Sequence, residues 1–357
     1  MRAIILASLA LAASPALAAD FPFHADHLVP GERIVTDVHA TGGGPQTGAH
    51  DLRVLRHVAD NDWERLLVGL VDAVPFNAIN PNYLIYNRPF YAMAGGTVVG
   101  CWRNAPENPS PPSKHPEVST GAGTGHILLA GNHIWIKQAD GNIALYAHAV
   151  PGSIPASLCP HNAQLLTNKA VNGGPTPLEP EAVVNGGATV VAGQQLGNIG
   201  NSGNSSEPHL HVHMVDAGNN WKPMNFDRGQ TKSFAGNTAS LYGTWTSLKG
   251  NALPMARILI WPPYPVGNWT YNGIAAADFQ SFFDHFVDSG MMADTISCHN
   301  DGATYDTTWV PAQGSWVAEA SLSLPDYVAK NATYVAEGFH QTSFFICGTH
   351  TAAIWRK

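Results

Sequence analysis

The segment from Glu207 to His213 constrains the fold most, because its polar and apolar residues alternate strictly. It reads E-P-H-L-H-V-H, with histidine at every second position. Side chains alternate between the two faces of a strand, so His209, His211 and His213 are predicted to share one face while the intervening apolar residues enter the core. His209 and His213 would lie roughly 13 Å apart along the strand. At most two of the three can therefore bind one metal ion.

Similar short runs surround this segment and predict a mainly β fold. They are rich in β-branched and aromatic residues and are separated by Gly, Asn and Pro, which is typical of short strands joined by turns. The chain has 35 glycines and 26 prolines, in agreement with many turns. The predicted strands cover residues 97–99, 133–137, 143–149, 189–191 and 209–215. In the third of these, alternation predicts that Ala144, Tyr146 and His148 share one face.

Composition divides the 357 residues into five stretches. We interpret them as a signal peptide (1–18), an N-terminal extension (19–74), a central β domain (75–235) with an insertion at about 151–184, a linker (236–267) and a repeat domain (268–357). The extension looks irregular except for a helical pattern over residues 62–70. The insertion is rich in Pro, Asn and Gly and is too long for a hairpin loop.

The last 90 residues contain two similar units and predict a small α+β domain. In the first unit, Phe279, Phe282, Phe283 and Phe286 recur at helical spacing, with Asp278 available as a cap and Gly290 as a stop. Two strand-like runs, 295–298 and 305–310, follow the helix. The second unit repeats this order over residues 324–335, 343–347 and 351–355. Stacking of the units would bury both helix faces together.

The N-terminus and the cysteines predict export. Arg2, an apolar run over residues 4–13 and the sequence Ala16-Leu17-Ala18 form a signal-peptide pattern, so we expect cleavage after Ala18 and a secreted or periplasmic protein. No stretch reaches the roughly 18 apolar residues of a membrane-spanning helix. Four cysteines in an exported chain favour disulfides, and their positions favour Cys101 with Cys159 and Cys298 with Cys347, with buried free thiols as the alternative.

The net charge argues against polyanionic partners. The formal net charge is −8 and no block of like charges occurs. We therefore expect neither nucleic acid nor an anionic membrane surface as a partner.

Three motifs in the central stretch resemble those of the lysostaphin/LytM-type zinc endopeptidases. In chain order they are Y-A-H at 146–148, V-x-x-G-Q-x-x-G-x-x-G-N-S-G at 190–203 and P-H-L-H at 208–211. The resemblance implies a LytM-type antiparallel β-sheet domain. It makes His211 a zinc ligand, and it implies that His209 and His148 orient water or stabilise the oxyanion. His213 matches no functional position of the family and is expected at the surface or behind the ligands.

The sequence departs from the family where the other two ligands are expected. An H-x-x-x-D motif should precede the strand at 90–92, but residues 76–89 contain no His, Asp, Glu or Cys. Asparagine and tyrosine are poor zinc ligands. A site made from His148, His209 and His211 alone is one alternative. The other alternative is that residues from elsewhere replace the missing zinc ligands. The candidates are His50, Asp51 and His57 in the N-terminal extension, together with His115 and His161. A His24-Ala25-Asp26-His27 segment also looks metal-binding.

Two functions follow from this mixture of present and missing residues. The missing ligands favour a catalytically degenerate module that binds peptidoglycan peptides or regulates a partner cell-wall hydrolase, with zinc at low occupancy. The alternative is an active zinc metalloendopeptidase that cleaves peptidoglycan cross-bridges through a non-standard metal site. Metal content distinguishes the two.

Overall fold

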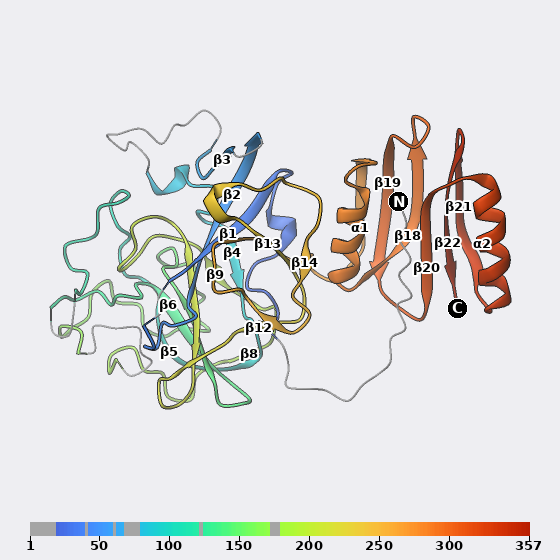
Figure 1. Cartoon of the computed structure of the whole chain (residues 1–357). Coiled ribbons are helices and arrows are strands. Elements are labelled where there is room, and N and C mark those ends of the chain that lie inside the picture. The colour runs from blue at the N-terminus through green and yellow to red at the C-terminus, as the bar shows by residue number, and fades with distance from the viewer. Residues whose placement is uncertain (1–18, 40–41, 60–61, 68–78, 121–123, 172–178) are drawn as a thin grey trace.

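The computed structural model describes residues 19–39, 42–59, 62–67, 79–120, 124–171 and 179–357. The signal peptide predicted at 1–18 lies outside these residues. The protein is mainly β with antiparallel sheets, which confirms the predicted fold class, and Figure 1 shows a large β unit beside a smaller α+β unit. Among the described residues, no helix is long and apolar enough to cross a membrane.

One large sheet organises the first unit. Its main path is β14 (Thr246–Ser247), β13 (Gln230–Ser233), β16 (Ile258–Trp261), β1 (Glu32–Val38), β2 (His50–Ala59), β10 (Leu210–Val215), β7 (Ile143–Ala147), β6 (His133–Gln138), β5 (Gly96–Trp102) and β8 (Thr189–Val190). In addition, β11 (Trp221–Lys222) pairs with β10, and β3 (Asp62–Glu64) pairs with β2. The strands predicted near 97–99, 133–137, 143–149, 189–191 and 209–215 are confirmed as β5, β6, β7, β8 and β10.

Smaller elements complete this unit. Two-stranded sheets join β4 (Pro89–Tyr91) to β9 (Gln195–Asn198) and β12 (Asn225–Phe226) to β15 (Asn251–Ala252), and the 3-10 turns are η1 (Ala25–His27), η2 (Asn80–Asn82) and η3 (Ala235–Asn237). The core covers one face of the large sheet. Its fully buried members include Ile34 of β1, Leu52 of β2, Val212 of β10 and Ile136 of β6.

The N-terminal stretch differs most from its prediction. Residues that looked irregular form β1 and β2, which pair along seven residues from Glu32 and Arg56 to Val38 and His50. Both strands lie inside the large sheet, because β1 also pairs with β16 and β2 also pairs with β10. The helix predicted over 62–70 is wrong where the structure describes it: Asp62–Glu64 is strand β3, and Trp63 packs on His57 and Phe234. Residues 68–70 lie outside the described residues.

The predicted linker at 236–267 instead contributes a central strand. Four consecutive apolar residues, Ile258–Trp261, form β16 between β1 and β13, and all four are buried. A continuous apolar run of this length is typical of a strand covered on both faces. The insertion at about 151–184 has no helix or strand among its described residues and is tied to β5 by the Cys101–Cys159 disulfide.

The C-terminal unit has the predicted repeats, each with one additional strand. The first comprises β17 (Trp269–Ala275), α1 (Phe279–Asp288), β18 (Met291–His299) and β19 (Thr304–Pro311), and the second comprises β20 (Trp316–Leu322), α2 (Leu324–Ala336), β21 (His340–Cys347) and β22 (His350–Arg356). Each repeat forms a three-stranded sheet, ordered β17-β19-β18 or β20-β22-β21. The predicted second disulfide, Cys298–Cys347, joins β18 to β21 across the two repeats and is confirmed.

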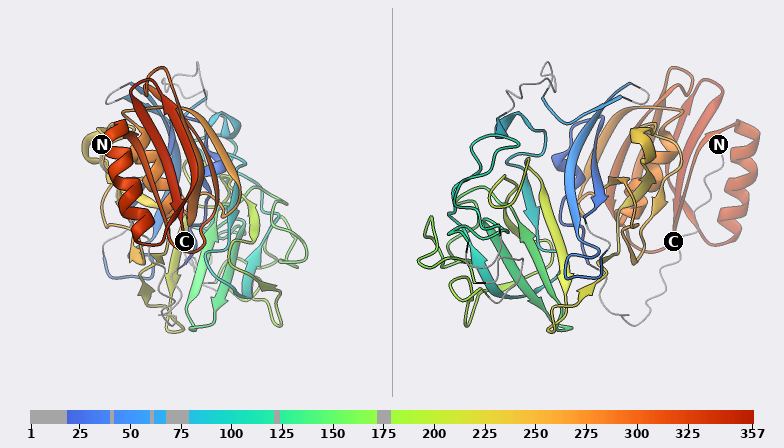
Figure 2. Two further views of the ribbon diagram at one scale, coloured as in Figure 1. Left: turned by 90° about the vertical axis from the view of Figure 1, so that its right-hand side faces the viewer. Right: turned by 60° about the vertical axis from the view of Figure 1, so that its left-hand side comes forward.

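The two helices are not buried together, contrary to the sequence-based expectation. The phenylalanines of α1 lie in a large cluster with Trp309 and Trp316, whereas Tyr334 of α2 belongs to a separate cluster with Trp355. Figures 1 and 2 show α1 beside the large sheet and α2 on the far side of the C-terminal unit. The difference arises because strands of both repeats lie between the helices.

Candidate metal centre

Strand β10 carries the predicted row of histidines. Leu210 and Val212 are fully buried in the main core, so His209, His211 and His213 face the opposite side of the sheet, as alternation predicts. All three residues are also buried, with exposed fractions of 5% or less.

Strand β2 places an aspartate directly beside the central histidine. The antiparallel register pairs Asp51 with His211, so both side chains emerge on the same face. Asp51 Oδ1 lies 2.8 Å from His211 Nδ1 and 3.5 Å from His209 Nε2. This contact places Asp51, one of the substitutes suggested by the sequence, beside His211, the zinc ligand that the family resemblance implies.

His39 completes a set of three ligands and was not identified from the sequence. It follows β1 directly, and its Nδ1 lies 3.0 Å from Asp51 Oδ2 while its Nε2 lies 3.0 Å from Gln46 Oε1. The ligand atoms of His39, Asp51 and His211 all lie within 4.8 Å of one another. The useful signal was the pair of alternating segments at 32–38 and 50–59, because a hairpin formed by them returns the chain from His39 to Asp51.

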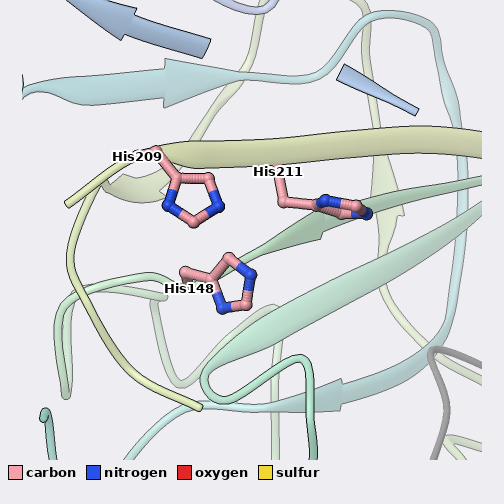
Figure 3. A group of neighbouring side chains, drawn as sticks. All are labelled: His148, His209 and His211. Atoms are coloured by element: carbon pink, nitrogen blue, oxygen red, sulfur yellow. The ribbon is translucent and has the colours of Figure 1, made fainter. Parts of the chain in front are cut away.

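His148 forms a second group with His209 and His211. Their ligand atoms also lie within 4.8 Å of one another, and the rings of His148 and His209 are 4.7 Å apart (Figure 3). The prediction that His148 shares a face with Tyr146 is wrong. Tyr146 is buried in the core and its hydroxyl accepts a hydrogen bond from the Met93 backbone, whereas His148 has a φ of 70°, which turns its ring to the other face.

The glycine-rich motif supports this turn. Gly131 and Gly203 both have positive φ, and a side chain on either would collide with the backbone of the other's loop. This close approach holds the intervening Ser202 carbonyl 2.7 Å from His148 Nδ1. A carbonyl only accepts, so Nδ1 carries the proton and Nε2 is left as the acceptor in the neutral ring.

His209 is oriented by a similar contact. Its Nδ1 donates to the Glu207 carbonyl at 2.8 Å, which leaves Nε2 on the side of Asp51. The Glu207 carboxylate is held by Arg53 at 2.7 Å and by Arg65 at 2.5 Å. Two arginines therefore fix the start of β10 next to the cluster.

The charges of the group suit metal binding. Burial lowers the pKa of His211 and of His148, so both rings are neutral at neutral pH. Burial alone would raise the pKa of Asp51, but the charge of His209 and hydrogen bonds from His209, His211 and His39 outweigh it and hold that pKa well below its usual value. Within the set His39, Asp51 and His211, the hydrogen bond with Asp51 raises the pKa of His39, so zinc binding there would displace a proton from that ring. Two imidazoles and a carboxylate are a usual zinc donor set. Tetrahedral zinc ligands lie roughly 3.3 Å apart, close to the spacing found here.

The other sequence candidates lie apart from this cluster. His50 pairs in register with Val212 and contacts Thr36, and burial lowers its pKa to about 4. His161 stacks on Trp102, and His115 accepts a hydrogen bond from the Glu117 backbone. Among the described residues, His50, His57, His115 and His161 belong to no group with metal-binding spacing.

Two further histidine arrangements were only partly foreseen. His213 is fully buried, and its Nδ1 lies 2.9 Å from His211 Nε2, so it lies behind the candidate ligand rather than at the surface. His24, Asp26 and His27 do come within metal-binding distance of one another, but His24 stacks on Tyr91 and His27 Nε2 lies 2.5 Å from the Tyr91 hydroxyl.

A cavity of about 150 Å³ opens beside the cluster. Its walls combine the candidate ligands with small or aliphatic side chains, and they are formed by His39, Gln46, Leu129, Ala130, Leu145, Ala147, His148, Asn204 and His211.

Comparisons with known proteins give partial similarities. No protein-family model and no curated protein matches the sequence. Among solved structures, the catalytic domain of lysostaphin from Staphylococcus simulans matches with 19% identity over 40% of this chain and 72% of its own length, at a TM-score of 0.20. A zinc-containing peptidase from Vibrio cholerae matches with 16% identity over 47% of this chain and 46% of its own length, at a TM-score of 0.20. The catalytic domain of an M23 protein from Enterococcus faecalis matches with 18% identity over 47% of this chain and 85% of its own length, at a TM-score of 0.17. Similarities at these TM-scores do not establish a family.

Proposed function

We propose that this chain is an exported zinc-dependent peptidase that cleaves peptide cross-bridges of peptidoglycan. One observation carries the proposal. His211 belongs at once to a two-histidine, one-aspartate ligand set with His39 and Asp51 and to a group with His148 and His209. A hydrolytic zinc site needs both parts, namely three protein ligands with an open position and nearby groups that transfer protons.

The residues around the cavity would have separate roles in metal binding and proton transfer. Zinc held by His39, Asp51 and His211 would supply Lewis acidity and make water more acidic. His209 directs its Nε2 toward Asp51 at 3.5 Å and would pass a proton between the attacking water and the departing amine. His148 presents its Nε2 as an acceptor beside it and would orient the water molecule. The carbonyls of Glu207 and Ser202 fix the orientation of both rings.

The substrate class is supported by two features of the chain. The Y-A-H and P-H-L-H motifs resemble those of peptidoglycan endopeptidases. The cavity wall beside His148 contains Ala130, Ala147 and Leu145, which leave room for a peptide with small side chains and no strongly charged group. A peptide cross-bridge fits this surface.

A metal-free binding module is the second candidate, and one observation favours it. Both oxygens of Asp51 already have histidine partners at 2.8 and 3.0 Å, so the carboxylate is satisfied by protein groups alone. Such a module would bind peptidoglycan peptides, or regulate a partner hydrolase, through the same cavity.

Metal analysis of the purified protein separates these functions. After mild dialysis we expect one zinc per chain in the native protein, with loss of zinc and of peptide release from cross-linked peptidoglycan in Asp51→Asn and His211→Gln. His148→Gln should keep zinc and lose hydrolysis, because it does not belong to the ligand set. His50→Gln is the matched control, since His50 adjoins Asp51 but faces Thr36 and should leave both properties unchanged.

The opposite result has a clear form. If zinc is sub-stoichiometric, and if peptidoglycan binding without hydrolysis is the same in the native protein and in Asp51→Asn, the binding module is correct and the peptidase is not.

Export is part of the proposal and has its own support. Two disulfides occur in the described structure, and disulfides are typical of oxidising compartments. The backbone nitrogen of Ala19 donates a hydrogen bond to the Asn225 carbonyl at 2.7 Å. The residue expected as the mature N-terminus therefore already packs against the folded domain. N-terminal sequencing of protein from the native host should begin at Ala19, and retention of Met1 would contradict this prediction.

A further inference from the structure

Arg33 is a buried cation on β1, away from the histidine cluster, and among the described residues it has no carboxylate partner. Its exposed fraction is 4%. Nη1 donates to the Glu32 carbonyl at 2.7 Å, and the Tyr242 hydroxyl also interacts with the guanidinium. Within ordinary hydrogen-bond geometry, Nε and Nη2 have no partner among the described residues. The neighbouring Glu32 carboxylate is bound by Arg88 at 2.7 and 3.0 Å and is not available to Arg33.

Aromatic rings surround the guanidinium and only partly replace the missing anion. Its carbon lies 3.9 Å from the centre of the Trp261 ring and 5.5 Å from that of Trp245. Cation–π contacts of this kind offset only part of the free energy that burying an unpaired ion costs. Burial lowers the pKa of Arg33 to about 10, so the side chain is still charged at neutral pH.

A cavity of about 50 Å³ lies against this cation, where the large sheet meets the C-terminal unit. Its wall includes Arg33, Trp261 and three tyrosines, Tyr242, Tyr264 and Tyr271. All three phenols interact electrostatically with Arg33, and burial raises the pKa of each, so their hydroxyls stay protonated and can donate. The loop 28–31 forms another part of the wall, and Val29 and Pro30 in it are exposed, which gives the cavity an opening to solvent.

We propose that this cavity binds a carboxylate group, such as the end of a peptide or of a small organic acid. A planar guanidinium with unused donors matches a carboxylate, and protonated phenols supply further donors to its oxygens. The volume admits a group of a few heavy atoms, so the rest of the ligand would extend past loop 28–31. The site is independent of the proposed peptidase activity because it shares no residue with the histidine cluster.

The test uses the tryptophan fluorescence of the whole, metal-depleted protein, because Trp261 lies in the cavity wall. Acetate and N-acetylglycine serve as probes, with N-acetylglycine amide as the uncharged match. We expect a saturable change with both acids, at least tenfold weaker binding of the amide, and at least tenfold weaker binding of both acids by Arg33→Gln. Tyr264→Phe, which removes one hydroxyl and keeps the ring, should weaken binding less and guards against misfolding of the arginine variant.

Controls separate this site from the candidate metal centre. Asp51→Asn should bind N-acetylglycine as the native protein does, and loss of binding in that variant would overturn the proposal. So would equal binding of the acid and the amide, binding unaffected by both Arg33→Gln and Tyr264→Phe, or binding of inorganic phosphate but of neither acid. If only acetate binds, the ligand is a small organic acid. If both acids bind, the ligands include the C-terminal carboxylates of peptides.

Discussion

At the scale of single residues, His213 contacts the candidate ligand His211 from behind. The two rings are linked by a 2.9 Å contact between His211 Nε2 and His213 Nδ1, and His213 packs edge-on against Trp135. Groups that bond the far side of a metal-binding histidine fix its tautomer and orientation. If His211 binds zinc, His213→Leu should weaken zinc binding about 10- to 100-fold, measured by competition with a chelator.

A remote buried histidine provides the control for that experiment. His285 of α1 is equally buried but lies in the C-terminal unit, so His285→Leu should leave zinc affinity unchanged. Equal zinc affinity in His213→Leu and the native protein would mean that the contact does not support the metal site.

His285 also predicts how stability depends on pH. Its ring stacks on Trp261 at 4.0 Å, and neither nitrogen has a hydrogen-bond partner among the described residues. Burial, together with the charge of Arg33, holds its pKa well below 6.5 in the folded state. As pH falls below about 6.5, the unfolded state takes up this proton first and the folded state is destabilised.

Replacing His285 with phenylalanine should remove that destabilisation. The free energy of unfolding of His285→Phe, relative to the native protein, should rise by up to about 1.4 kcal/mol per pH unit below pH 6 and be constant above pH 7. Urea denaturation between pH 5 and 7.5 measures it. Parallel stability curves for the two proteins would show that His285 does not control this range.

At the scale of elements, the two helices differ in their caps. The Ser323 hydroxyl accepts a hydrogen bond from the Asp326 backbone at 3.2 Å at the start of α2, whereas Asp278, expected to cap α1, makes no such bond. Ser323→Ala should therefore lower the free energy of unfolding of the C-terminal unit by about 1 kcal/mol, and Asp278→Ala by clearly less. Thermal denaturation of the two variants compares them directly, and a larger loss for Asp278→Ala would contradict the observed caps.

Sequence patterns predicted a helix or strand correctly where the spacing of residues along the chain alone decides which side chains are buried. The phenylalanine spacing found α1, and alternation found β10 with its buried Leu210 and Val212. Alternation failed at His148, because its positive φ breaks the two-residue period at the end of β7. A periodic pattern cannot reveal a residue with positive φ. The position of the His148 ring also depends on the Ser202 carbonyl, which belongs to a loop distant in the sequence.

At the scale of the whole molecule, the candidate site depends on contacts between segments far apart in the sequence. Asp51 meets His211 only because β2 pairs with β10, 160 residues later. The resemblance to the LytM-type family predicted the missing ligands just before residue 90. Strand pairing over such a distance leaves no local signal, so Asp51 was only one of several candidates and His39 was not considered.

The last prediction tests whether β1 and β2 belong to the same folding unit as the central domain. Removing residues 19–59 would delete two inner strands of the large sheet together with His39 and Asp51, and would uncover the edges of β16 and β10. We expect the shortened chain to lose its near-ultraviolet circular dichroism and to bind no zinc. Removing residues 268–357 is the comparison, since no strand of the large sheet lies there, and that chain should keep its tertiary signal and the zinc affinity of the whole protein. A folded, zinc-binding chain without residues 19–59 would show that the N-terminal strands are an accessory and that the ligands lie elsewhere.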